Sequence, residues 1–358
     1  MRQHRTRLHR LALPAAVPLA VALLAAGAGT ANAASSPQGV VAYQSSPANE
    51  NELALYNSAV GLTQPVGMEF GTSPSIATEL GEPSAFAVAI ANSNNELYID
   101  TSNGILLSSG PDLETGTSPS IALVPTIAGR VAIAVAFVAP GDTLTIVTYT
   151  TTSNNGYQES IINTGDAVTA GTSPSVALDP GGSGNYEVAY EGTDDARLAV
   201  YSSSTGTSST VNLGMLSGTS PSITTDGTSF EVAVEANTDY LYTQNLTSSA
   251  RIDTGLGMPT SGGSSPAIAW DPSGTGEFQA AFQANTGKMW TYEVDTKTAD
   301  NTGFGMKSGS SPSISGSLDY GYELAFQANT GVLWYWHSNG NTQINTGITM
   351  EANPSISG

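Results

Sequence analysis

The fold is decided by Gly309-Ser310-Ser311-Pro312-Ser313-Ile314-Ser315, because variants of this stretch recur along the chain. Five related copies and a truncated one are Gly71–Ala77, Gly116–Ala122, Gly171–Ala177, Gly218–Thr224, Gly263–Ala269 and Asn353–Ser357. Their prolines stand at positions 74, 119, 174, 221, 266, 312 and 354, so the steps are 45, 55, 47, 45, 46 and 42 residues. A period in this range is typical of a repeat architecture.

The residues between two copies predict further strands. A block such as Phe278–Gln283 alternates large apolar residues with Ala or Gln, a period of two that indicates a strand. A hairpin turn such as Ala328-Asn329-Thr330-Gly331 follows, then a strand that begins with Leu or Met, as in Leu333–Trp336, and then an Asn-Thr-Gly segment, Ile344–Met350. Four short strands per unit are typical of a β-propeller blade. The hairpin turns inside each unit argue against the rival, a parallel β-solenoid.

The two chain ends complement each other. Six complete blades begin near residues 72, 117, 172, 219, 264 and 310; residues 39–70 lack a first strand, and residues 352–358 are a first strand alone. Together they predict a seventh blade, whose closure removes exposed sheet edges. We therefore expect an all-β, seven-bladed β-propeller of four-stranded antiparallel blades in a single domain, 34–358. The longest step adds residues around Tyr149–Tyr157, for which we expect a lengthened surface loop.

Residues 1–33 predict a secretory signal peptide. Arg2, Arg5, Arg7 and Arg10 precede an apolar run, and Ala31-Asn32-Ala33 supplies small residues for cleavage. The alternative is an uncleaved anchor, but Pro14 and Pro18 interrupt the apolar run. We therefore expect a secreted, extracellular protein without membrane insertion.

Charge and composition limit the binding partners and the kinds of reaction that the chain can have. Without the leader, six basic residues face thirty acidic ones, a net charge of −24, which disfavours nucleic acid as a partner. There is no cysteine, and His337 is the only histidine outside the leader. We expect no catalytic residues, no metal site and no cofactor, since neither a Ser-His-Asp triad nor a zinc site has the residues it needs.

The succession of SPSIA, YEVAFQANTG-like, LWxYx-like and NTGxGM-like segments resembles the PLL-like seven-bladed β-propeller lectins, and more loosely the tectonin-type propellers. The resemblance extends from about Gly39 to Gly358. It implies carbohydrate binding at several sites around one ring, with glycans or cell-surface carbohydrate as partners, and a homo-oligomer.

The candidate ligand-binding residues are aromatic and amide side chains. The second and fourth positions of the third strand project to one face, and nearby amides would orient sugar hydroxyls. The candidates are Tyr242, Trp290, Tyr292, Trp334, Trp336, Gln283, Gln327, Asn285 and Asn329. The alternative is that the aromatic rings pack between blades, and different rings can fill the two roles.

Three functions stay open on the sequence. The first is a secreted, multivalent, lectin-like propeller without catalytic activity. The second is a secreted protein-interaction scaffold, since the propeller fold does not determine function. The third is a propeller glycosidase that uses paired carboxylates.

Overall fold

The computed structural model describes residues 39–46, 51–58, 61–62, 64–79, 82–153, 156–181, 183–260, 263–273 and 276–358. Contacts divide the chain into Met1–Ser35 and Ser36–Gly358, and all described residues belong to the second unit. The predicted signal peptide, 1–33, lies outside them and stays a prediction. The described residues contain strands and no helix, hence no helix long and apolar enough to cross a membrane.

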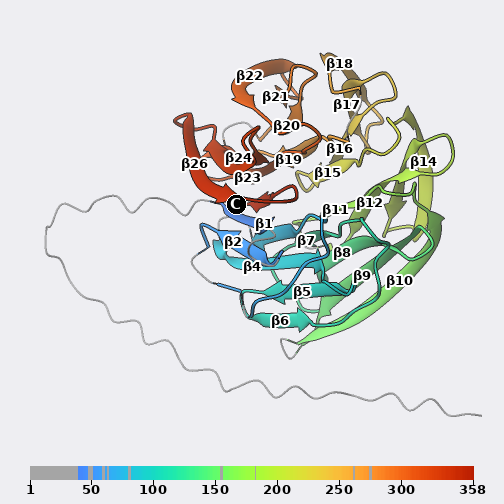
Figure 1. The fold of residues 1–358 in the computed structure, drawn as a ribbon. Helices are drawn as coiled ribbons and strands as arrows, with labels where there is room; N and C mark the ends of the chain where they lie inside the picture. The colour runs from blue at the N-terminus through green and yellow to red at the C-terminus, as the bar shows by residue number, and fades with distance from the viewer. Residues whose placement is uncertain are drawn as a thin grey trace, which may run out of the picture. The chain divides into compact units, whose positions relative to one another are not determined.

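Seven antiparallel sheets make seven blades, which we number in chain order (Figure 1). Blade 1 combines β1 (Val40–Gln44), β2 (Leu53–Tyr56) and β27 (Ser355–Ser357). Blade 2 has β3 (Ser75–Glu79), β4 (Glu82–Ala91), β5 (Leu97–Thr101) and β6 (Gly104–Leu107). Blade 3 has β7 (Ser120–Leu123), β8 (Val131–Ala139), β9 (Thr143–Thr151) and β10 (Tyr157–Ala167). Blade 4 has β11 (Ser175–Leu178), β12 (Tyr186–Gly192), β13 (Arg197–Ser202) and β14 (Thr207–Gly214).

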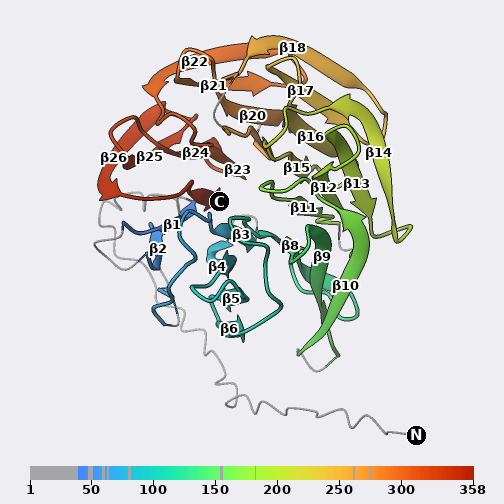
Figure 2. The same ribbon diagram turned by 45° about the vertical axis from the view of Figure 1, so that its right-hand side comes forward.

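The remaining three blades repeat this order. Blade 5 has β15 (Ser222–Thr225), β16 (Phe230–Glu235), β17 (Tyr240–Asn245) and β18 (Arg251–Gly257). Blade 6 has β19 (Ala267–Trp270), β20 (Phe278–Gln283), β21 (Lys288–Glu293) and β22 (Thr298–Gly305). Blade 7 has β23 (Ser313–Ser317), β24 (Gly321–Gln327), β25 (Val332–His337) and β26 (Thr342–Thr349). The outer strands β14, β18, β22 and β26 follow the rim in Figure 2.

The predicted seven-bladed propeller is confirmed, including closure by the C-terminal strand. β27 pairs antiparallel with β1, so that Val41 lies opposite Ile356. Blade 1 shows three strands in its described residues. In the described part of 57–70, where its fourth strand was expected, the pairings are two isolated bridges, Glu52 with Gly67 and Met68 with Asn92.

The expected loop around Tyr149–Tyr157 is wrong at both of its ends. Tyr149–Thr151 belong to β9, and Tyr157 begins β10, the longest strand. The extra residues lengthen the blade 3 hairpin instead, because the alternating Thr and aliphatic residues of β9 suit a strand that is buried along most of its length.

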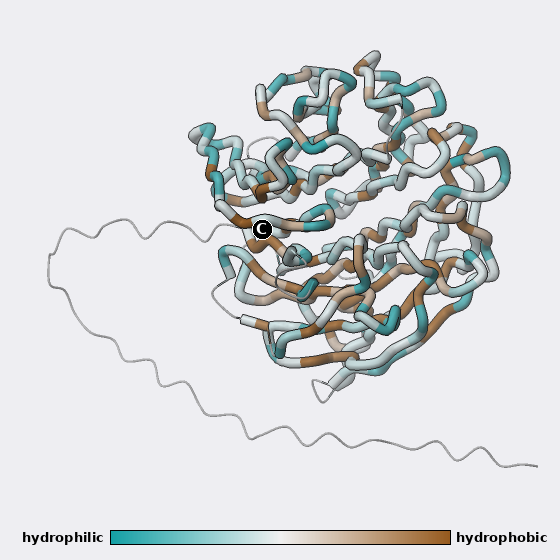
Figure 3. Tube along the Cα trace, in the orientation of Figure 1, coloured by the Kyte–Doolittle hydropathy of each residue, from teal (hydrophilic) through white to brown (hydrophobic). Residues whose placement is uncertain are grey.

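The core lies between the blades. Each of the seven buried hydrophobic clusters combines residues from two adjoining blades, so the clusters follow one another around the ring. In β20, Phe282 packs in the cluster shared with blade 5, whereas Ala281 packs in the cluster shared with blade 7. The bulky and small faces predicted for this strand therefore meet different neighbours. Hydrophobic colour is densest around β4 to β10 in Figure 3.

The recurrent Ser-Pro-Ser motif joins the innermost strands by two series of hydrogen bonds. In one, the backbone N–H of the first serine donates to the Oγ of the first serine in the next blade, as from Ser173 to Ser220 at 2.9 Å. In the other, the second serine's Oγ accepts from the next blade's aliphatic residue, as Ser222 does from Ile268 at 3.1 Å. Each motif thus exchanges hydrogen bonds with both neighbouring blades.

The Asn-Thr-Gly segments form bulges in the outer strands. In β18, Thr254 Oγ1 donates to the Leu241 carbonyl at 2.8 Å, and Gly255, at φ +67°, donates its N–H to Asp253 Oδ1 at 3.0 Å. The register of β17 and β18 shifts at this point. Glycine is needed here because its positive φ is strained for other residues.

Truncation tests the closure of the ring. Deleting residues 352–358 removes β27 and its bonds from Thr78 N to Ser357 Oγ and from Ile356 N to Ser313 Oγ. We expect the melting temperature to fall by roughly 10 °C or more, since each kcal/mol shifts it by about 2–4 °C in a large domain. Thermal unfolding followed by circular dichroism measures this. A truncated chain as stable as the full one would contradict closure.

The second serine series has one gap, at Ala267. Restoring the hydroxyl with Ala267→Ser offers the Ile314 N–H the acceptor that Ser222 provides for Ile268. We expect the free energy of unfolding to rise by about 0.5–1.5 kcal/mol, the net value of one hydrogen bond. Ser222→Ala is the matched control and should destabilise by a similar amount in urea unfolding. An Ala267→Ser protein no more stable than the parent refutes the role of the series.

Candidate functional site

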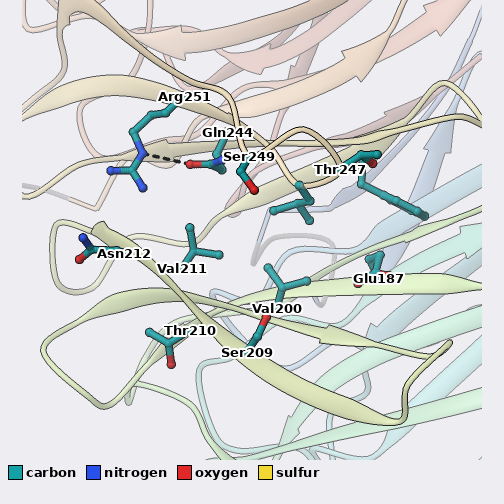
Figure 4. A pocket seen from close by; sticks show the side chains of 12 residues that line it. Glu187, Val200, Ser209, Thr210, Val211, Asn212, Gln244, Thr247, Ser249 and Arg251 are labelled. Atoms are coloured by element: carbon teal, nitrogen blue, oxygen red, sulfur yellow. Dashed lines mark hydrogen bonds between the residues drawn. The ribbon is translucent and has the colours of Figure 1, made fainter.

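A polar cavity lies between blades 4 and 5 (Figure 4). This 4/5 cleft has a volume of about 460 Å³. It is lined by Glu187, Val200, Ser209, Thr210, Val211 and Asn212 of blade 4 and by Phe230, Gln244, Leu246, Thr247, Ser249 and Arg251 of blade 5. A cavity of this size with a few converging polar groups is typical of a small-ligand site.

Arg251 begins β18 and stands at one side of the cleft. Its Nε donates to Gln244 Oε1 at 3.0 Å. Gln244 is itself 3% exposed, and its Nε2 donates to the carbonyls of Asn245 and Ala250 at 3.0 and 3.2 Å. The buried, uncharged amide therefore orients the exposed guanidinium without neutralising its positive charge.

Glu187 supplies the carboxyl group of the 4/5 cleft. Burial raises its pKa, and a hydrogen bond from Ser202 Oγ to Oε1, at 2.7 Å, opposes that rise. Val200, Val211, Phe230 and Leu246 form an apolar wall beside it and belong to the cluster between the two blades. The cleft thus combines a cation, a carboxyl group, hydroxyls and an apolar surface, which suits a small ligand with both polar and apolar faces.

An equivalent 5/6 cleft of about 410 Å³ lies one blade further on. Phe278 and Val294 occupy the places that Phe230 and Leu246 have in the 4/5 cleft, and Glu231 takes the place of Glu187. Glu231 is 3% exposed, and burial is the main cause that raises its pKa to about 7. The repeat therefore builds the same apolar and acidic frame twice.

A third cavity, of about 280 Å³, surrounds the propeller axis. Aliphatic side chains of the innermost strands line it, among them Ile121, Ile223, Ile268 and Ile314. Since it offers few polar side chains to orient a ligand, we do not assign it a site.

The structure places the predicted amide residues beside the connections between blades. Gln283 Nε2 donates to the Lys307 carbonyl at 3.0 Å, and Gln327 Nε2 donates to the Met350 carbonyl at 2.5 Å. Both glutamines are buried, whereas Asn285 and Asn329 are exposed at hairpin turns and lie against Gly257 and Gly305 of the preceding blade.

The predicted aromatic residues lie in the contacts between blades. Tyr292 and Trp336 are buried, and Trp336 Nε1 donates to Asn341 Oδ1 at 2.7 Å. The half-buried rings of Tyr242, Trp290 and Trp334 each border the cluster shared with the preceding blade. This placement agrees with inter-blade packing. The lining of the 4/5 and 5/6 clefts includes none of the nine predicted residues, so their ligand-binding role stays a prediction.

Sequence reasoning missed Arg251, Gln244 and Glu187. One signal was available: Arg251 is one of only six cations outside the leader. Its cross-strand partner is Gln244, whereas the equivalent pair in blade 6 is Ala299 and Tyr292. His337, by contrast, is buried, and its Nδ1 lies 2.6 Å from the Asn339 carbonyl oxygen.

Near the end of the second strand, blades 4 and 5 carry buried glutamates, Glu191 and Glu235. The last residue of β16, Glu235, is fully buried, and neither of its carboxyl oxygens has a hydrogen-bond partner. Burial, followed by repulsion from Asp239, raises its pKa to about 8. At the equivalent place Gln283 donates to a linker carbonyl, and Glu191 Oε2 accepts from Gly218 N at 3.2 Å.

Glu235 predicts stability that falls with rising pH. Its pKa in the folded chain is about 8, above the ordinary value of 4.5, so between these two pH values the folded state binds more protons than the unfolded state. The free energy of unfolding therefore decreases as the pH rises from 4.5 to about 8. We expect Glu235→Gln to stabilise the protein by about 1–3 kcal/mol at about pH 9 and by much less at about pH 5. Urea unfolding at both values measures this, with Glu191→Gln as a control of smaller effect. Equal gains at both pH values would refute the buried charge.

Comparison with known proteins gives the fold. No protein-family model and no curated protein sequence matches the chain, so membership of the PLL-like family stays a prediction. Among solved structures, a mutant of the Aleuria aurantia lectin AAL, in complex with Fucα1-6GlcNAc, has a TM-score of 0.58 and 13% identity over 79% of this chain and 98% of its own. AofleA from Arthrobotrys oligospora has a TM-score of 0.56 and 12% identity over 81% and 91%.

A third similar structure is the SapL1 lectin in complex with alpha methyl fucoside, with a TM-score of 0.52 and 12% identity over 79% of this chain and 98% of that chain. One structure of the Aleuria aurantia lectin is described as a six-bladed β-propeller, so this chain has one blade more. At these identities the likeness shows the propeller architecture, and the neighbours with this architecture include several lectins.

Proposed function

We propose that this chain is a secreted, carbohydrate-binding propeller without catalytic activity, and that the 4/5 cleft holds a sugar residue. The observation that carries the proposal is the exposed guanidinium of Arg251, fixed by Gln244 beside the apolar wall of Val211, Phe230 and Leu246. Guanidinium and carboxyl groups bind sugar hydroxyls, and the apolar wall covers the carbon face of the ring. The lectins among the structural neighbours support the same class of ligand.

Several weak sites on one ring suit a multivalent ligand. The 4/5 and 5/6 clefts open between successive blades, so a glycan-rich surface would engage both, and avidity would exceed the affinity of either. Secretion rests on the character of residues 1–33, and a cell-surface or extracellular glycan is the partner we propose.

Replacing Arg251 tests the proposed function. Arg251→Ala removes the exposed guanidinium and should weaken glycan binding by about tenfold or more, the loss expected for hydrogen bonds to a charged group. A glycan array followed by calorimetric titration measures this. Lys288→Ala is the matched control, since this exposed lysine donates to the Gly303 carbonyl, outside both clefts. A well-folded parent protein that binds no glycan above background would refute the proposal.

A further inference from the structure

The 4/5 and 5/6 clefts share one wall, the hairpin that joins β17 to β18. Successive residues of this hairpin line the two clefts alternately. Thr247, Ser249 and Arg251 line the 4/5 cleft, and Ser248, Ala250 and Ile252 line the 5/6 cleft. The partition between the clefts is therefore a single layer of backbone.

The hairpin is held in shape before any ligand binds. Asn245 Oδ1 accepts the backbone N–H groups of Thr247 and Ser248 at 3.1 and 2.7 Å. Gln244 closes the base of the turn through the Asn245 and Ala250 carbonyls. The two clefts lie on either side of blade 5, so an oligosaccharide that crosses this hairpin would reach both.

The two clefts share a frame and differ at their polar edge. Both have a phenylalanine, an aliphatic residue and a glutamate at equivalent positions, although Glu231 is buried and Glu187 is half-buried. At the polar edge, Thr247 of the 4/5 cleft corresponds to Asp295 of the 5/6 cleft, and Ser249 corresponds to Lys297. The cross-strand partner of the fifth residue in the third strand also differs: it is Arg251 in blade 5 and Ala299 in blade 6. Repeated sites for one sugar would keep the polar contacts that recognise its hydroxyls, whereas these contacts change.

We propose that the two clefts form one composite site for an oligosaccharide that contains two different sugar residues, one on each side of the β17–β18 hairpin. This inference rests on the proposed function and makes it more specific. Under this proposal the 4/5 and 5/6 clefts are not equal, independent sites for one sugar, but two sites with different selectivity. The ligand class that follows is a hetero-oligosaccharide segment.

The test uses a glycan array of homo- and hetero-oligosaccharides of graded length, probed with the full chain and with Arg251→Ala and Lys297→Ala. Both substituted side chains are exposed, so the variants should keep the parent melting temperature. The tightest glycan on the array and its component monosaccharides are then titrated calorimetrically. We expect the tightest glycan to contain two different residues and to bind at least about tenfold more tightly than either component.

The variants separate the two clefts. Arg251→Ala should abolish the response to one component and Lys297→Ala the response to the other, and each should reduce binding of the oligosaccharide to the level of a single residue. Lys288→Ala should leave all three affinities unchanged. Oligosaccharides that bind no more tightly than monosaccharides, or a Lys297→Ala protein with the parent affinity, would overturn the composite site while leaving the proposed function intact. A folded parent that binds no saccharide would overturn both.

Discussion

The rest of the structure depends on the hydrogen bonds that the Ser-Pro-Ser motifs exchange around the axis. The innermost strand of each blade is the edge of its sheet and is not paired with the innermost strand of the next blade. The backbone N–H groups on this free edge therefore need other hydrogen-bond partners. Serine hydroxyls supply them, and one motif serves both neighbours, as Ser220 does by accepting from Ser173 and donating its N–H to Ser265. Proline limits the backbone freedom between the two serines, which favours the same local conformation in each copy of the motif.

This constraint at the axis determines where ligand sites can arise. The inner ends of the blades are linked closely, and the seven hydrophobic clusters fill the space between them. Further out, hairpins such as the one that joins β17 to β18 are freer to vary, because the serine series does not reach them. The 4/5 cleft accordingly lies over the cluster that holds Phe230 and Leu246 together, and residues such as Arg251 are added at its edge.

The sequence predicts the fold well because its determinants are local and repeated. The prolines mark each blade, and the fragments around Val41 and Ile356 complement each other without any knowledge of the packing. The clefts were not predictable in the same way, because the lining residues come from different strands of two blades, as Glu187 and Arg251 do. Gln283 and Gln327 were expected near a ligand, yet their amides bond to linker carbonyls, which follow them by more than twenty residues in the chain.

The scarcity of cations gives Arg251 its significance. Of the other arginines, Arg197 pairs with Asp195 in the only salt bridge of the described residues, and Arg130 donates to the Ser183 carbonyl. Arg251 is held by the neutral amide of Gln244 instead. A carboxylate partner would satisfy the charge inside the protein, whereas an amide orients the guanidinium and leaves the charge unmatched. In the proposed site, the Gln244–Arg251 pair would therefore present an oriented cation to oxygen atoms of a ligand.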